Sequence, residues 1–183
     1  MKTKVLTFIF TLCVHFSVGQ IVHSISIGPD LGIPTESFGK ANLGFGGSLE
    51  YNVKFSGPVG AQFHIGYQSF SNKIYSDQKV TFLPIRLGVI GFIYQDILFL
   101  NADAGISHYY SPSTGTNQNG FTFGAGGGSK LKLGSGQFIQ VSAYYNLHHY
   151  DGLYAGNGYN YNWFNIRAAY GLSWGKKNDN KSE

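Results

Sequence analysis

After residue 20 the sequence alternates between apolar and polar residues in runs of roughly 10–14 positions, which is the period-two pattern of β-strands. Eight such runs occur, and the connections between them alternate in length. Short turns lie at residues 55–58, 94–96 and 134–136, whereas longer polar loops lie near residues 34–40, 71–79, 111–119 and 151–160. The pattern predicts eight antiparallel strands with tight turns at one end and long loops at the other.

The fourth run shows how the two faces of a strand differ. It places Leu83, Ile85, Leu87 and Val89 on one face and Arg86 on the other. In the remaining runs the charged positions and most glycines likewise share one face, while Leu, Ile, Val, Phe and Tyr fill the other. The first run (23–33) and the sixth (121–133) alternate less clearly, because glycines interrupt them.

Alternation alone would also fit a soluble lipocalin-like barrel, whose inside is apolar and whose outside is charged. The N-terminus favours a membrane barrel instead. Lys2 and Lys4 precede an apolar run at 5–14, and small residues follow at 17–19, as in a secretion signal. Cys13, the one cysteine, follows Leu12 rather than a small residue, so we expect no lipoprotein cleavage and no disulfide in the mature chain.

The sequence therefore predicts a signal peptide at residues 1–19, a transmembrane β-barrel domain at 20–175 and a disordered periplasmic tail at 176–183. No stretch after residue 20 approaches the roughly 18 apolar residues of a membrane helix, so strands must cross the membrane. Every backbone group must then pair, which requires the first strand to lie beside the eighth. The short turns and both termini are expected in the periplasm, with the long loops outside the cell.

Composition agrees with this prediction. Charged residues make up 12% of the chain, against about a quarter in soluble domains. The net charge of +4 falls to about +2 once Lys2 and Lys4 leave with the signal, which argues against a nucleic-acid partner. The expected partners are outer-membrane lipid, lipopolysaccharide and the barrel insertion machinery.

Two further patterns concern the strands. Pro29 and Pro84 lie inside strand runs and remove a ladder donor, so we expect a bulge or a bend near each. Tyrosines and tryptophans near strand ends are typical of interfacial girdles at the two membrane surfaces. The girdle candidates are Tyr67, Tyr94, Tyr109, Tyr110, Tyr150, Tyr161, Trp163 and Trp174.

Three pairs of charged or ionisable residues are predicted to face the lumen. In a hairpin, residues equally far from the turn lie opposite one another. Counting from the turns places Glu50 near His64 and Arg86 near Asp103, and counting along the closing strands places Asp30 near Arg167. These pairs could form a gate or a catalytic cluster, but we favour a structural role, because eight strands leave room only for side chains. Glycines on the same face are expected to make that room.

Catalytic and metal chemistry find little support. His148 and His149 point to opposite faces of one strand, and the mature chain has no cysteine, so a zinc site is not expected. Small outer-membrane barrels include lipid A-modifying enzymes. A serine, histidine and acid set of that kind could consist of Ser142, His148 and Asp151. Ser142 lies six residues before His148, too far along a strand for hydrogen-bond contact. We predict no enzyme activity, cofactor or metal.

The fourth long loop, which is rich in Tyr, Gly and Asn, is the best candidate for contact with a partner outside the cell. Its tyrosines are Tyr150, Tyr154, Tyr159 and Tyr161. An interfacial girdle with a flexible tip is the competing interpretation.

The chain resembles the small eight-stranded outer-membrane β-barrels of Gram-negative bacteria, the OmpA/OmpX-like family. The similar segments are IGPDLGIP at 27–34, GFGGSLEY at 44–51 and LPIRLG at 83–88. One departure is that nine residues follow Trp174, where such barrels commonly end on an aromatic residue. The resemblance implies residence in the outer membrane more than any one task. We predict a non-enzymatic barrel with a lumen plugged by the ion pairs and a structural or surface-interaction role. A narrow porin-like channel is the alternative, and a lipid A-modifying enzyme is a more remote one.

Overall fold

The protein is an all-β barrel, seen in a computed structural model that describes residues 21–35, 38, 41–73, 78–113, 115–150 and 159–175. The predicted signal peptide (1–19) and tail (176–183) lie outside these described residues. The strands are β1 (Val22–Pro34), β2 (Ala41–Lys54), β3 (Val59–Asn72), β4 (Lys79–Ile93), β5 (Leu98–Ser111), β6 (Thr116–Gly134), β7 (Gln137–Tyr150) and β8 (Tyr159–Gly175).

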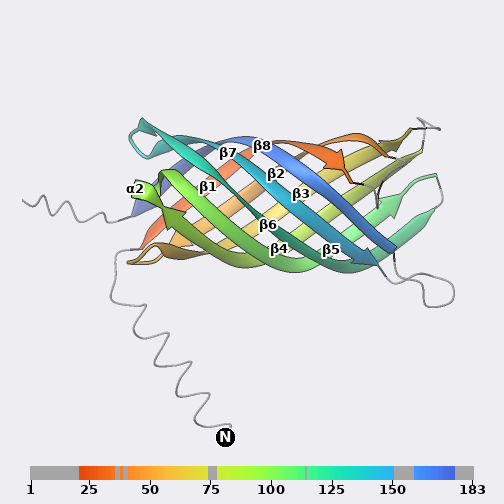
Figure 1. Ribbon diagram of the computed structural model, residues 1–183, viewed down its shortest axis with the longest axis horizontal. Helices are drawn as coiled ribbons and strands as arrows, with labels where there is room; N and C mark the ends of the chain where they lie inside the picture. Colours follow the sequence, from red (N-terminus) through yellow and green to blue (C-terminus); the bar gives the residue numbers. More distant parts are fainter. Residues whose placement is uncertain are drawn as a thin grey trace, which may run out of the picture.

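The eight strands form one closed up-and-down sheet. Each strand is antiparallel to the next, and β1 pairs with β8 from Val22↔Gly175 to Pro34↔Trp163. Figure 1 shows the resulting tilted cylinder, in which β1 begins and β8 ends at the same mouth as the short connections. The predicted eight-stranded antiparallel barrel is therefore confirmed, and the sheet has no free edge.

The short connections are built as the sequence suggests, with one difference. Phe55 N–H donates to Val59 O at 3.0 Å and closes the first turn. In the third turn Gly134 and Gly136 have φ values of 108° and 80°, which glycine adopts without a steric penalty. The middle turn is the short helix α2 (Tyr94–Ile97), four residues long rather than three. This extra residue shifts the pairing of β4 with β5.

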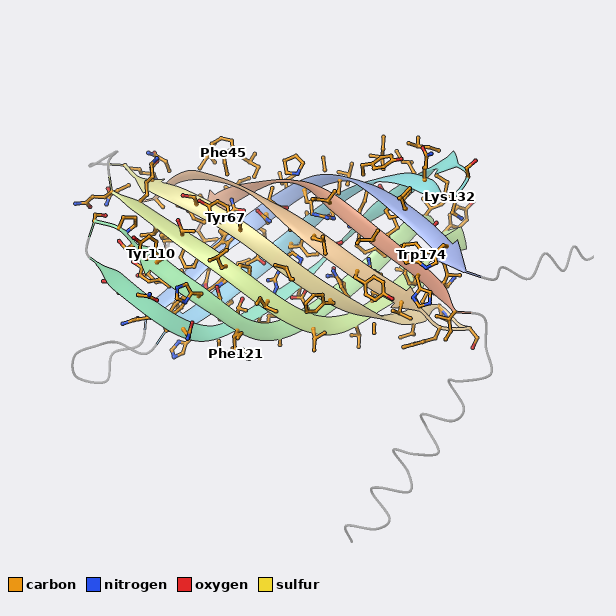
Figure 2. The ribbon with its side chains drawn as sticks, turned by 180° about the vertical axis from the view of Figure 1, so that it is seen from behind. Phe45, Tyr67, Tyr110, Phe121, Lys132 and Trp174 are labelled. Atoms are coloured by element: carbon orange, nitrogen blue, oxygen red, sulfur yellow. The ribbon has the colours of Figure 1, made fainter. Side chains whose placement is uncertain are left out.

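The barrel is apolar outside and polar inside, the reverse of a soluble protein. On β4, Leu87 and Val89 are 66% and 61% exposed, whereas Arg86 is 3% exposed. Figure 2 shows Phe45 and Phe121 standing on the outer surface. The predicted assignment of the two faces is confirmed along this strand. Within the described residues, no helix is long and apolar enough to cross a membrane.

Neither proline shifts the strand register. Pro84 pairs with Ser107 within an unbroken ladder, and the β1–β8 register is the same before and after Pro29. The predicted bulge at these prolines is therefore wrong, whereas the alternative of a bend stays a prediction. One ladder beside each proline is interrupted, since β1–β8 has no pair for Pro29 and β3–β4 has none for Pro84. Register shifts occur elsewhere, between Ala41 and Gly44 in β2 and between Lys132 and Gly134 in β6.

Candidate functional site

The lumen holds the charged residues that the sequence places on the inner face. Glu50 on β2 lies opposite His64 on β3, with 3.6 Å between His64 Nδ1 and Glu50 Oε1. Asp30 on β1 lies opposite Arg167 on β8, with 3.9 Å between Arg167 Nε and Asp30 Oδ1. All four side chains are buried.

Arg86 and Asp103 form an ion pair but are not directly opposite. Arg86 pairs with Gly105, and Asp103 pairs with Gly88, so the two residues are offset by two positions in the register. The two side chains meet diagonally, with 3.1 Å between Arg86 Nε and Asp103 Oδ1. Arg86 Nη1 also donates to Asn146 Oδ1 of β7 at 2.6 Å. The arginine therefore joins β4 to β7 through the barrel interior.

Glu50 accepts hydrogen bonds from residues across the lumen, and it forms an ion pair there as well. Arg167 Nη1 lies 3.1 Å from Glu50 Oε2, closer than Arg167 lies to its predicted partner Asp30. Gln140 Nε2 and Tyr144 Oη, both on β7, each donate to Glu50 at 2.8 Å. Groups from β2, β3, β7 and β8 thus meet at one carboxylate, and side chains span the lumen at this level.

Glycine makes room for these long side chains, as predicted. A methyl group at Gly124 would lie 2.6 Å from Arg86 Nη1 and would also strike Asp103. Gly66 faces His64 in the same manner, at 3.0 Å from His64 Nε2. The charged residues and the glycines beside them therefore form one packed layer.

A second layer, the aromatic plug, fills the lumen at the long-loop end. Its rings come from β3, β4, β7 and β8 and from the connection between β1 and β2. Trp163 lies with its ring centroid 4.9 Å from that of Phe82 and 5.0 Å from that of Phe70. The members of the plug are Phe38, Phe70, Phe82, Tyr150 and Trp163.

The aromatic plug corrects part of the girdle prediction. Trp163 and Tyr150 are 2% and 1% exposed, and Tyr109 and Tyr161 pack against the plug, so none of these four belongs to an outer girdle. The sequence could have predicted an inward Trp163, because it lies four residues before Arg167 on the same strand and therefore on the same face. The other girdle candidates are exposed, namely Tyr67, Tyr94, Tyr110 and Trp174.

The four tyrosines of the candidate contact loop do not share one environment that the structure describes. Tyr150 and Tyr161 lie at the mouth of the lumen, with 6.0 Å between their ring centroids. Tyr154 and the side chain of Tyr159 lie outside the described residues. The structure therefore places two of the four tyrosines against the plug.

The residues considered for catalysis and metal binding serve other contacts. Ser142 and His148 are both buried on β7, and Asp151 lies outside the described residues. His148 stacks on Trp163 with 4.3 Å between ring centroids and shares a 3.3 Å hydrogen bond with Thr122 Oγ1. Among the described residues, no three His, Cys, Asp or Glu side chains gather as metal ligands.

No protein-family model matches the sequence, and a search of curated proteins gave no match. Solved structures do resemble the fold. The attachment invasion locus protein Ail of Yersinia pestis superposes with a TM-score of 0.56 at 15% identity, over 84% of this chain and 98% of that one. Neisserial surface protein A superposes with a TM-score of 0.53 at 15% identity, over 85% of this chain and 96% of that one.

Ail has also been solved in complex with the heparin analogue sucrose octasulfate, and that structure matches with a TM-score of 0.54 at 14% identity, over 86% of this chain and all of that one. At such identities the likeness concerns the fold. The chain therefore has the fold of the small eight-stranded transmembrane β-barrels, and the predicted resemblance is confirmed at that level.

Proposed function

We propose that this protein is an integral outer-membrane barrel with a closed lumen, and that it serves a structural or surface-interaction role through its long loops. The observation that carries this proposal is the filling of the lumen at two levels. Glu50 gathers donors from strands on opposite sides, and the aromatic plug closes the long-loop mouth. The outer face of Leu, Ile, Val and Phe supports residence in lipid.

A narrow channel is the competing function, and single-channel conductance separates the two. Because buried side chains cross the lumen, the purified barrel in a planar bilayer should give no steady current. A large general porin, reconstituted in the same bilayer, is the positive control. Regular, voltage-stable current steps from the purified protein would contradict the closed lumen.

The orientation we propose puts the long loops outside the cell and both termini in the periplasm, as is usual for such barrels. The sequence offers a clean test, since Cys13 lies in the predicted signal peptide. Ser113→Cys lies in the β5–β6 connection at the long-loop end, and Ser135→Cys lies in a short turn at the other end; both positions are exposed. The β5–β6 connection is only residues 112–115, shorter than the predicted loop at 111–119, because β6 already begins at Thr116. A maleimide on a polymer too large to cross the outer membrane should label only Ser113→Cys on intact cells. Preferential labelling of Ser135→Cys would reverse the orientation.

The proposed role is non-enzymatic. Ser142 and His148 are separated by six positions on β7, which is roughly 20 Å along a strand, so they do not form a nucleophile and base pair. His148 is fully buried between the aromatic plug and Thr122. Outer-membrane lipid, lipopolysaccharide and the barrel insertion machinery remain the partners that we propose.

A further inference from the structure

The lumen at the short-turn end contains a lysine surrounded by aromatic rings. Lys130 on β6 is 7% exposed and points inward, as its neighbour Leu131 points outward. Its Nζ lies 5.0 Å from the ring centroid of Phe138, 5.3 Å from that of Phe92 and 5.6 Å from that of Phe99. Such distances give favourable cation–π contacts with all three rings.

Apart from these ring contacts, Lys130 makes little direct polar contact. An ammonium group has three donors, and the hydrogen bond seen for Lys130 Nζ is a long one of 3.5 Å to Ser24 Oγ. Within the described residues no carboxylate forms a salt bridge with it. Asp96, which lies at this mouth, pairs with Lys54, and Glu50 deeper in the barrel pairs with Arg167. A buried charge is costly unless it is paired, and an anion in contact with Lys130 would pair it.

A cavity of about 70 Å³ lies directly beside Lys130. Among the described residues, its charged lining consists of Lys54, Lys130, Lys132 and Asp96. This volume is several times the ~10–15 Å³ that one water molecule needs, so the cavity can hold a small ligand. The cavity lies at the short-turn end of the barrel, where Figure 2 shows its lining residue Lys132.

The cavity wall combines these lysines with apolar and hydroxyl groups. Phe92 and Phe138 supply flat apolar surface, and Ser24 supplies a hydroxyl within reach of Lys130. Lysine is a common ligand of phosphate, which accepts several charge-assisted hydrogen bonds at once. The rings of Phe92 and Phe138 in the cavity wall favour a ligand that also carries a short apolar part.

We infer that this mouth of the barrel binds a small soluble phosphate monoester, with the phosphate at Lys130 and the apolar part against Phe92 and Phe138. The ligand is held there rather than passed through, because Glu50 and its partners cross the lumen beyond the site. In the proposed orientation the site opens to the periplasm. Its binding test does not depend on that orientation or on conductance.

Calorimetric titration of the full chain in an uncharged detergent with butyl phosphate tests the inference. Saturable binding is expected, and Lys130→Met should weaken it at least tenfold while keeping the length of the side chain. The matched control is Lys79→Met, since Lys79 is an exposed lysine at the opposite end of β4. A melting curve in the same detergent shows that each variant is folded, so that loss of binding is not loss of structure.

Two other titrants define the ligand class. Inorganic phosphate should bind more weakly than butyl phosphate, because it lacks the part that contacts the rings. A short-chain phosphatidylglycerol, a lipid phosphodiester, should also bind more weakly, and tighter binding would overturn the assignment to a soluble monoester. Absence of saturable butyl phosphate binding, or equal binding by Lys130→Met, would overturn the site itself.

Discussion

At the scale of single residues, Glu50 shows what hairpin counting finds and what it misses. Counting from the turn places His64 opposite Glu50, and the register agrees. It cannot find Arg167, because that residue lies on a strand that does not pair with β2, and the contact forms across the lumen. Closure of the barrel creates such contacts, so they depend on the width of the cylinder and not on local sequence.

The Arg86–Asp103 pair gives a prediction at this scale. Arg86→Ala leaves Asp103 buried, without its ion-pair partner, which should lower the free energy of unfolding by about 3–5 kcal/mol. Thermal melting in detergent measures the loss. The double variant Arg86→Ala/Asp103→Ala removes both charges and should recover part of it. Unchanged melting of Arg86→Ala would show that the pair contributes nothing to stability.

At the scale of strands, the odd or even position of a residue predicts the face on which it lies better than its distance from the strand end does. Aromatic residues near strand ends suggest a girdle, yet Trp163 and Tyr150 share the parity of inward residues such as Arg167 and Asn146. Parity read to the end of each strand would have placed them in the lumen. It fails where a strand shifts register, as at Ala41, which is buried one position out of phase with Gly44. Phe38, in a connection, follows no strand pattern.

The outward face of β4 gives a prediction at the strand scale. Leu87→Arg puts a charge in the middle of the lipid-facing row and should cost about 2–4 kcal/mol of unfolding free energy in bilayers. The same change at Val59, an outward residue at the start of β3 near the first turn, should cost about 0–1 kcal/mol. Denaturant titration in liposomes compares them. Equal costs at the two sites would contradict the depth that we assign to Leu87.

For the whole molecule, the eight-strand architecture and its inside-out polarity follow from the sequence, whereas the way the lumen closes does not. Alternation, turn lengths and the need to pair every backbone group predict the cylinder. The plug depends on Phe38 and on rings from four strands meeting at one mouth. The caged Lys130 likewise depends on rings from three other strands.

The most direct measurement is of contacts between lipid chains and side-chain methyl groups on β4. Val89 and Ile90 are neighbours on this strand, 61% and 1% exposed, so one should touch lipid and the other should not. In lipid nanodiscs, NMR cross-relaxation from acyl-chain protons should reach the methyl groups of Leu87 and Val89 and be absent at Ile90. Lipid contacts at Ile90 with none at Val89 would show that the apolar face does not face the membrane.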